Sequence, residues 1–318
     1  MKSCPEALVN MFKDEKGAKN VLAIHSLSKV YTDKIAVNNL ELAVKGGEVL
    51  GFLGPNGSGK TTTFRMVLGI IPPTSGTILW HNKMMQRLPK KTIGYLPEER
   101  GLFAHISVRE QIQLFARLKG MPKRKVDTAM HYWAERLKFT EYLDKKVSEL
   151  SKGNQQKIQL AIAIIHEPSL LILDEPFSGL DPLNVELLKS VVHEMKQKGT
   201  TILFSSHRMD HVEELCEKIC ILKQGKPILS GYIDDIKKNF GQNKLVIEGN
   251  EDFSSLQGMK EIQDFKYTKH GVTFMIKSPT VAQTIFSRLK EFSAITKFSL
   301  EEPSLNDIFL AKVGHHDE

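Results

Sequence analysis

The chain is poor in cysteine and has no long apolar run. Its 318 residues include three cysteines, Cys4, Cys216 and Cys220, whose spacing fits neither a zinc site nor a disulfide framework, so we expect a reducing compartment. Cys216 and Cys220 could lie one turn apart on a helix, and we expect them to be buried apolar residues. No apolar run approaches the roughly 20 residues that span a bilayer. Charged residues interrupt the N-terminus early, so we expect neither a membrane span nor a secretory signal.

The excess of positive charge lies in the first part of the chain. The formal net charge is +7, and from Lys244 onward nine Lys and Arg face eleven Asp and Glu, so residues 1–243 carry +9. Basic residues cluster at Arg87–Lys91 and Lys119–Lys125, which we expect to be loops. Aromatic residues do not alternate with these charges. The clusters therefore favour a solvated face or one turned toward an anionic membrane surface, and nucleic acid is not the expected partner.

Strand-like and helix-like segments alternate from Val21 to about Leu229, which predicts an α/β core. The best strand candidates are Val49–Leu53, Thr92–Tyr95, Leu170–Leu173 and Thr201–Ser205. Residues 1–20 are polar and without periodicity, so they predict a flexible leader. We expect a first domain at 21–230 and a C-terminal α+β domain at 231–318. Its expected elements are strands at Lys244–Glu248, Ile262–Thr268, Val272–Ile276 and Ala294–Leu300, with helices at Thr280–Glu291 and from Pro303.

A helical subdomain is expected at about residues 98–150. Apolar stripes fall on Leu114, Phe115 and Leu118 and, further on, on Met130, Trp133 and Leu137. We interpret both stripes as the core of that subdomain. Another helix is expected to begin at Pro182, after a capping carboxylate, and to end before Gly199.

The run that follows the predicted strand Val49–Leu53 fits the phosphate-binding pattern G-x-x-x-x-G-K-[ST]. Glycines let backbone N–H groups turn inward around a polyphosphate, and a helix that begins there directs its positive end to the same anion. Lys60 can reach the β- and γ-phosphates, and the Thr61 hydroxyl can complete the shell of a bound Mg²⁺. The sequence therefore predicts ATP binding by Gly54, Pro55, Asn56, Gly57, Ser58, Gly59, Lys60, Thr61 and Thr62.

Two carboxylates follow the apolar run Leu170–Leu173. Asp174, at the end of a buried strand, is placed to bind Mg²⁺. Glu175 can polarise the attacking water as a general base, an effect worth about 10²–10⁴-fold in rate. An acidic strand end alone is weak evidence, because such residues often cap the next helix. Together with Lys60 and Thr61 it predicts a nucleoside triphosphatase.

A third stretch, Leu150-Ser-Lys-Gly-Asn-Gln-Gln156, precedes Asp174 by about twenty residues and opens a predicted helix that runs to about His166. Taken with the phosphate motifs, it resembles the LSGGQ signature of ATP-binding cassette (ABC) ATPases. The resemblance extends to Ser178–Asp181, similar to the D-loop, to His207, similar to the switch histidine, and to Tyr31, which looks like the residue that stacks on adenine. These motifs keep the family's order over residues 21–229.

The resemblance implies a P-loop fold of ABC type and a head-to-tail pair of cassettes. Each ATP would lie between the phosphate loop of one cassette and the signature of the other, with Ser151, Gly153, Asn154 and Asp181 contributed in trans. Ser151 and Gly153 lie at the N-terminus of the predicted helix, where the Ser151 hydroxyl and the Gly153 N–H can donate to a γ-phosphate. The implied partners are a second copy or a related ATPase subunit, and a separate membrane permease that docks on the helical subdomain.

The sequence departs from the common family pattern at two places. The signature carries Lys152 and Asn154, and Glu98 stands where the family usually has Gln. A carboxylate at Glu98 can still bind Mg²⁺. Both variants, and the ending Glu302–Phe309, resemble the sodium- and drug-extrusion-like branch. The catalytic set Lys60, Glu175 and His207 is intact.

We therefore expect the ATP-hydrolysing subunit of an exporter, at the cytoplasmic face of the plasma membrane. Two alternatives stay open. A soluble cassette ATPase acting on ribosomes or nucleic acid usually carries two cassettes or a long coiled-coil insertion, and this sequence has neither. A regulatory module that binds ATP without turnover is disfavoured by the intact Glu175. Neither the substrate nor the role of the C-terminal domain follows from the sequence.

Overall fold

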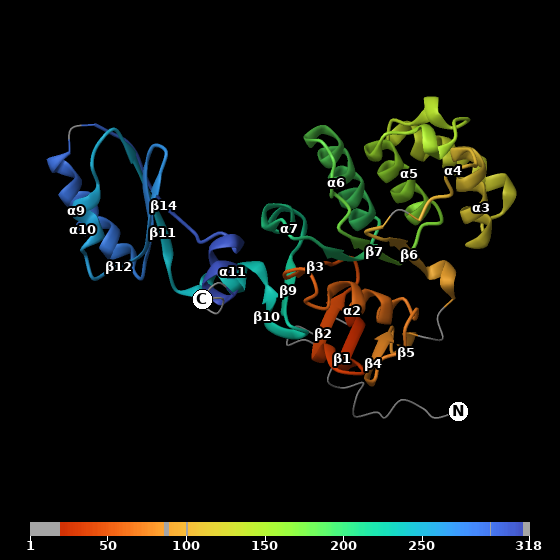
Figure 1. Cartoon of the computed structure of the whole chain (residues 1–318), viewed down its shortest axis with the longest axis horizontal. Helices are drawn as coiled ribbons and strands as arrows, with labels where there is room; N and C mark the ends of the chain where they lie inside the picture. The colour runs from red at the N-terminus through yellow and green to blue at the C-terminus, as the bar shows by residue number, and fades with distance from the viewer. Residues whose placement is uncertain (1–19, 86–88, 100, 293, 314–318) are drawn as a thin grey trace. The chain divides into compact units, whose positions relative to one another are not determined.

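The computed structural model describes residues 20–85, 89–99, 101–292 and 294–313. The expected leader, residues 1–20, lies outside this part apart from Asn20. The chain divides after Gly231 into two compact units, each with its own apolar core (Figure 1). Within the described ranges, no helix is long and apolar enough to cross a bilayer.

Among the residues that the structure describes, the first unit has strands β1 to β10 and helices α2 to α7. In chain order they are β1 (Asn20–Tyr31), β2 (Lys34–Lys45), β3 (Val49–Leu53), α2 (Lys60–Val67), β4 (Ser75–Trp80), β5 (Lys83–Met84), β6 (Ile93–Leu96), α3 (Val108–Leu118), α4 (Lys123–Arg136), α5 (Lys152–Ile164), β7 (Leu170–Asp174), α6 (Pro182–Gln197), β8 (Thr201–Ser205), α7 (Met209–Leu215), β9 (Lys218–Lys223) and β10 (Lys226–Tyr232).

The central sheet has the strand order β10-β9-β3-β8-β7-β6. Strands β9, β3, β8, β7 and β6 pair in parallel, so their carboxyl ends meet at one edge, where α/β proteins place their ligands. β3, β7 and β8 are buried along their whole length, which explains why they read as unbroken apolar runs. The predicted strands Val49–Leu53 and Thr201–Ser205 are confirmed to the residue. Thr92–Tyr95 is displaced by one position, because Thr92 ends a 3₁₀ turn.

A second, antiparallel sheet with the order β2-β1-β4-β5 covers one side of helix α2, and the central sheet covers the other (Figure 1). The core between the two sheets includes Phe52 of β3 and Phe64 of α2, whose rings meet edge to face at 5.3 Å. Helices α5, α6 and α7 lie on the opposite side of the central sheet (Figure 1). Helix α2, which follows the phosphate-binding pattern, is therefore packed from two sides.

Helices α3 and α4 pack against each other and against α5. Ser107 and Glu110 form a capping box at the start of α3. The expected stripe of Met130, Trp133 and Leu137 is buried, as predicted. The stripe on α3 was wrong as a core prediction, because Leu114 and Leu118 are exposed, Leu118 by 71%.

The buried face of α3 is formed by residues four positions apart, Val108, Ile112 and Ala116. The apolar stripe of this helix is thus wider than the face that its neighbours cover. The basic cluster Lys119–Lys125, expected in a loop, is partly helical, since Lys123 begins α4. Of the other cluster, residues 87 and 88 lie outside the described residues.

The cysteine expectation holds in part. Cys216 follows α7 and Cys220 lies in β9, so the two do not share a helix. Both are buried, as expected. Burial raises the pKa of the Cys220 thiol to about 12, which leaves it protonated and inert near neutral pH.

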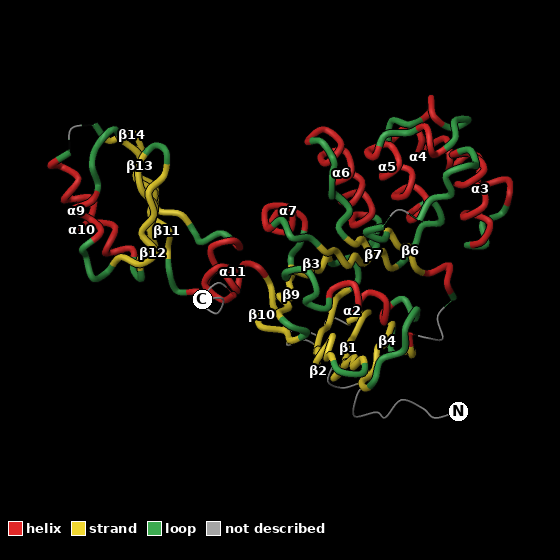
Figure 2. The backbone as a smooth tube through the Cα atoms, viewed as in Figure 1, coloured by secondary structure: helices red, strands yellow, loops and turns green. Residues whose placement is uncertain are grey.

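The second unit is an antiparallel sheet, one face of which is covered by helices α9 and α10 (Figure 2). Its elements are α8 (Ile233–Phe240), β11 (Asn243–Gly249), α9 (Ser254–Gln257), β12 (Ile262–Thr268), β13 (Gly271–Ile276), α10 (Pro279–Arg288), β14 (Ile295–Glu301) and α11 (Leu305–Val313). The strand order is β12-β13-β11-β14. The expected helix Thr280–Glu291 is divided, because α10 ends at Arg288 and a 3₁₀ turn follows.

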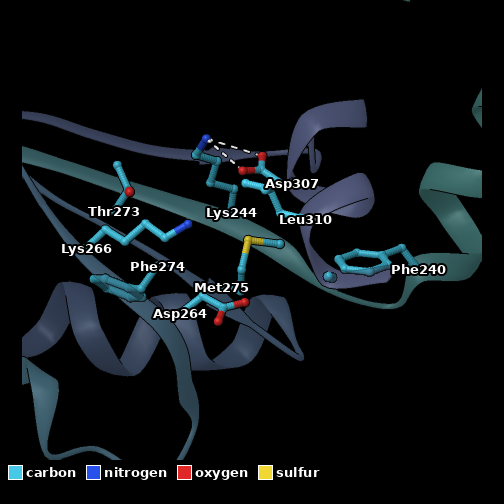
Figure 3. Close-up of a pocket in the computed structure, with 10 residues that line it drawn as sticks. Phe240, Lys244, Asp264, Lys266, Thr273, Phe274, Met275, Asp307 and Leu310 are labelled. Atoms are coloured by element: carbon cyan, nitrogen blue, oxygen red, sulfur yellow. Dashed lines mark hydrogen bonds and ion pairs between the residues drawn. The ribbon is translucent and has the colours of Figure 1, made fainter. Parts of the chain in front are cut away.

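Helix α11 is tied to the sheet beside a cavity of about 230 Å³ (Figure 3). Nζ of Lys244, on β11, lies 3.3 Å from Oδ2 of Asp307. The Asp307 carboxylate also accepts from the N–H of Ser304 over 3.0 Å, and the Ser304 hydroxyl accepts from the N–H of Asp307 over 3.2 Å. Burial raises the pKa of Asp307, but the bonds from Ser304 and the Lys244 charge outweigh it, so the pKa lies below its ordinary value. This reciprocal cap explains why α11 begins after Ser304.

Candidate functional site

The loop between β3 and α2 has a backbone that only glycine fits at two positions. The φ angles of Gly54, Gly57 and Gly59 are +145°, +77° and +109°. A Cβ at Gly54 would lie 2.2 Å from the carbonyl oxygen of Leu222, and one at Gly59 would lie 2.5 Å from that of Ala36. Glycine is therefore required at Gly54 and Gly59 for two reasons: the neighbouring backbone is too close for a Cβ, and the φ angles are positive.

Lys60, the first residue of α2, is buried in this loop. Its Nζ donates to the carbonyl oxygens of Gly54 over 2.7 Å and Pro55 over 3.2 Å. Burial lowers the pKa of the ammonium group, although the carboxylate of Glu175 opposes that shift. The Ser58 hydroxyl is also buried and has no hydrogen-bond partner among the residues described. The loop therefore holds donors that a phosphate group can satisfy.

A cavity of about 340 Å³ opens at the carboxyl edge of the central sheet. It brings together segments that are far apart in the sequence: the ends of β1 and β7, the phosphate loop and the loop after β6. Its lining contains Tyr31, Lys34, Ala36, Asn56, Gly57, Gly59, Lys60, Thr61, Thr62, Glu98, Asp174 and Glu175. Lys34 and Ala36, both on β2, were not anticipated from the sequence.

One hydroxyl group from the neighbouring strand β8 holds both the Asp174 carboxylate and the backbone of Glu175 at the end of β7. Oγ of Ser205 donates to Oδ1 of Asp174 over 2.6 Å and accepts from the N–H of Glu175 over 3.0 Å. Oδ2 of Asp174 is buried and has no partner within the described part of the chain. An unpaired carboxylate oxygen in a cavity that Thr61 also lines suits a hard cation such as Mg²⁺.

The described residues contain no group of three His, Cys, Asp or Glu that could hold a metal ion by themselves. Mg²⁺ usually takes one or two carboxylates and completes its shell with phosphate oxygens and waters. The arrangement of Asp174, Thr61 and Glu98 around one cavity fits that requirement.

Glu175 has a backbone in the left-handed region, with φ of +50°, and a carboxylate in contact with His207. Nδ1 of His207 donates to Oε2 of Glu175 over 2.9 Å, while the imidazole is 62% exposed. Burial raises the pKa of Glu175, and the opposing effects of His207 and Lys60 do not cancel that shift. A buried carboxylate with a raised pKa is a stronger base than a free one, as a general base requires.

Tyr31 ends strand β1 at the rim of the same cavity and is exposed. Nζ of Lys29 lies 5.0 Å from the centroid of the Tyr31 ring. An exposed aromatic face at this position can stack on a planar base.

The remaining predicted residues form a separate cluster, called here the signature group: Ser151, Gly153, Asn154 and Asp181. Ser151 caps α5 by accepting from the N–H of Asn154 over 3.3 Å, and Asp181 caps α6 by accepting from the N–H of Asn184 over 3.0 Å. A Cβ at Gly153 would lie 3.3 Å from Nδ2 of Asn184, so the two helix starts lie side by side. None of the four lines the cavity around Lys60.

Three residues of this region were missed by the sequence reasoning: Ser205, Asn184 and Gln159. Nε2 of Gln159, on α5, lies 3.4 Å from the carbonyl oxygens of both Pro97 and Glu99, which flank Glu98. The helix that begins at the signature therefore also supports the loop that carries Glu98.

Comparison with known proteins agrees with this geometry. The family described as ABC transporter matches residues 37–178, and that described as ATP-binding protein DrrA1-3-like, C-terminal domain, matches residues 231–313. The chain is 50% identical over 294 residues to an uncharacterized ABC transporter ATP-binding protein, YhaQ, of Bacillus subtilis, covering 92% of this chain and 99% of the relative. It is 32% identical to Nod factor export ATP-binding protein I of Rhizobium etli, covering 96% and 97%.

Solved structures show the same fold. A structure of an ATP-binding subunit of an ABC transporter is 30% identical and superposes with a TM-score of 0.66, over 70% of this chain and 93% of that one. The structure of cbiO1 from Clostridium perfringens, part of the transporter complex cbiONQ, is 29% identical, with a TM-score of 0.60 over 70% and 94%. The chain therefore belongs to the ATP-binding proteins of ABC transporters, the ATPases that couple hydrolysis of ATP to transport.

Proposed function

We propose that two copies of this chain, or one copy and a related ATPase subunit, pair head to tail around two ATP molecules. The observation that carries the proposal is the separation of the phosphate cavity from the signature group within one chain. Each group alone offers half of a site: Lys60 and its loop on one side, and the helix start at Ser151 on the other. Pairing would bring a γ-phosphate between them.

Exposed apolar surface beside the signature group supports this pairing. Leu183 lies two residues after Asp181, in the first turn of α6, and is 84% exposed. Ser151 and Lys152 are exposed as well. Burial of this side chain against a partner would remove apolar area from water and so favour the pair.

The residues of the cavity account for hydrolysis of ATP by in-line attack of water. Lys60 and the loop N–H groups bind the β- and γ-phosphates, and Tyr31 stacks on adenine. Glu175 orients the attacking water and accepts its proton, and His207 holds the Glu175 carboxylate and contacts the γ-phosphate. Thr61, Asp174 and Glu98 would hold Mg²⁺, which neutralises charge on the phosphates. In this assignment residues 21–230 form the ATPase domain and residues 231–318 an accessory domain.

We infer that a separate membrane subunit docks on the helical subdomain, at about residues 98–150. Phe103, Leu114 and Leu118 are exposed there, and the Phe103 ring stacks on Phe115 at 6.1 Å. A contiguous apolar surface of this kind suits the burial of a permease segment. The chain would then lie at the cytoplasmic face of the plasma membrane. The relative named for Nod factor export supports export as the direction.

Docking can be tested by co-purification with the membrane subunit. Leu114→Glu with Leu118→Glu is expected to reduce recovery of the complex and to leave ATP binding unchanged. Ile70→Glu, at another exposed apolar residue, is the matched control and should have no effect. Equal recovery of all three proteins would place the docking surface elsewhere.

Pairing can be tested by mixing two inactive variants. Lys60→Ala removes the phosphate contact and Ser151→Arg blocks the signature, so each variant alone should lose turnover. In a mixed pair, one of the two sites combines an intact loop with an intact signature. An equimolar mixture should therefore recover roughly a quarter of the wild-type rate. If the mixture recovers no activity, or if Ser151→Arg is active alone, the two halves do not complement each other across subunits.

A further inference from the structure

A second cavity of about 690 Å³ lies where the helical subdomain meets the central sheet. Its lining draws on five separate segments: the turn before β6, the loop between α3 and α4, helix α4, the residues that follow α5 and the end of α6. It shares no lining residue with the ATP cavity. The established ATPase chemistry therefore does not use it.

The cavity is strongly cationic. Five basic side chains face a single lining carboxylate, that of Glu167; the five are Lys91, Lys119, Arg124, Lys125 and Lys198. The two basic clusters that stand about thirty residues apart in the sequence thus contribute to one cavity. Convergence of like charges in a concave site concentrates positive potential there.

Most of this charge is not neutralised by the protein. Lys198 pairs with Glu194 over 2.8 Å, and Nζ of Lys119 donates to the carbonyl oxygen of Ile93 over 2.7 Å. The side chains of Lys91, Arg124 and Lys125 have no ion pair or hydrogen bond within the ranges that the structure describes. Three cationic groups are therefore available to an anion.

Two of these basic residues, Arg124 and Lys125, lie in the first turn of helix α4, where positive charge is unfavourable. Helix α4 begins with Lys123, Arg124 and Lys125, has no acidic residue in its first turn, and has no side-chain cap. The N-terminus of a helix carries partial positive charge, so basic side chains there repel it. An anion bound in the cavity would relieve both the side-chain repulsion and the uncapped N–H groups.

The cavity also offers an apolar wall and a buried acceptor. Tyr132 and Trp133 line it, and Nζ of Lys198 lies 5.6 Å and 5.2 Å from their ring centroids. Nε2 of His166 donates to the carbonyl oxygen of Ile93 over 3.2 Å. Burial and Lys119 lower the pKa of His166 to about 4, so the ring is neutral and its buried Nδ1 is an acceptor without a partner in the described chain.

We propose that this cavity binds a phosphate ester. The cations would hold the phosphate, and the aromatic wall would receive the apolar part of the same molecule. Two sources share this chemistry, a soluble phosphorylated metabolite and the head group of an anionic phospholipid. Because the lining joins α4 of the helical subdomain to the turn before β6 and the end of α6 in the core, the bound ligand would tie these parts together.

Binding can be measured on the full-length chain through Trp133, one of only two tryptophans. In a Trp80→Phe background, titration with glycerol 3-phosphate should change the Trp133 fluorescence, whereas glycerol should not. Calorimetry of the protein with both tryptophans provides the same affinity should the Trp80 variant fold poorly. Lys60→Ala should bind the probe normally, which separates this cavity from the phosphate loop.

Two double variants test whether binding depends on the basic residues of this cavity. Each removes two positive charges from the helical subdomain, the first variant inside the cavity and the second outside it. Arg124→Gln with Lys125→Gln should weaken binding by about tenfold or more, since charge-assisted hydrogen bonds are lost. Lys145→Gln with Lys146→Gln, exposed and outside the cavity, should not.

The lipid source is tested by co-sedimentation with phosphatidylglycerol vesicles against phosphatidylcholine vesicles. A soluble ligand is supported if the protein binds glycerol 3-phosphate and only the variant with Arg124→Gln and Lys125→Gln loses this binding. Selective sedimentation with phosphatidylglycerol, lost in the same variant alone, supports a lipid head group. Identical behaviour of the two double variants, or binding of neither probe, overturns the proposal.

Discussion

The hydroxyl group of Ser205 donates a hydrogen bond to Oδ1 of Asp174 over 2.6 Å. The same oxygen accepts from the N–H of Glu175, so one side chain on β8 holds both the Asp174 carboxylate and the backbone of Glu175. The position of both groups in the cavity therefore depends on a residue that itself does not line it.

Ser205→Ala should lower turnover and raise the Mg²⁺ concentration needed for activity. Loss of the hydrogen bond that the Ser205 hydroxyl donates to the buried Asp174 carboxylate should also lower the free energy of unfolding by about 1–3 kcal/mol. Steady-state ATPase assays and urea unfolding measure the two effects. Thr200→Val is the matched control, because it removes a buried hydroxyl, bonded to the carbonyl oxygen of Pro168, just before the same strand. If both variants retain normal turnover, Ser205 does not position the carboxylates.

The pH dependence of activity should reflect Glu175. Its carboxylate is the active form, so kcat/KM should fall as the pH drops through a pKa that burial raises above 4.5. His207 lowers that pKa by its charge and its hydrogen bond. His207→Ala should thus move the acid limb of the residual activity to higher pH, and His207→Gln, which keeps a donor, should move it less. An acid limb that stays in place or moves to lower pH would remove Glu175 from this role.

Glu98 lines the ATP cavity, whereas its neighbour Glu99 does not. Glu98→Ala should raise the Mg²⁺ concentration for half-maximal ATPase activity by roughly tenfold, a change typical of losing a group that supports a metal site. Glu99→Ala should leave the metal titration unchanged. Equal titrations for the two variants would place the Glu98 carboxylate away from the metal.

The second unit should depend on Asp307 for local stability. Its pKa is lowered in the folded state, so the stabilisation is present above the ordinary value of 3.8 and is lost as the pH falls through the folded pKa. At neutral pH, Asp307→Asn should destabilise α11 by about 1–3 kcal/mol, because the bonds to Ser304 and Lys244 weaken.

Amide hydrogen exchange of the α11 segment in the whole chain measures this effect. Asp264→Asn, at an exposed carboxylate that lines the same cavity, is the control and should leave the protection unchanged. Unchanged protection in Asp307→Asn would show that the reciprocal cap does not hold the helix.

The parts of the site that could be predicted are those encoded by local sequence. The phosphate loop was predictable because Gly54, Gly59 and Lys60 act within one short segment. The strands β3, β7 and β8 were predictable because both of their faces are buried, which leaves unbroken apolar runs. The two long strands β1 and β2 were not among the best strand candidates, because several register shifts in their pairing interrupt the alternation of buried and exposed residues.

The parts that could not be predicted depend on which elements become neighbours. Ser205 reaches Asp174 only because β8 lies beside β7, and Asn184 reaches Gly153 only because α6 begins beside α5. The exposure of Leu114 and Leu118 similarly depends on which face of α3 its neighbours cover. Periodicity indicates that a helix is apolar, but the tertiary packing decides which of its apolar residues are buried.

Helix α2 is enclosed between two sheets, and the phosphate loop is continuous with its first turn. Because α2 is packed from both sides, it has little freedom to tilt when ATP is exchanged for ADP. We therefore expect the phosphate loop to keep its position through the transport cycle. Gln159 joins α5 to the backbone on either side of Glu98, so the loop that carries Glu98 is coupled to the helix that begins after Ser151.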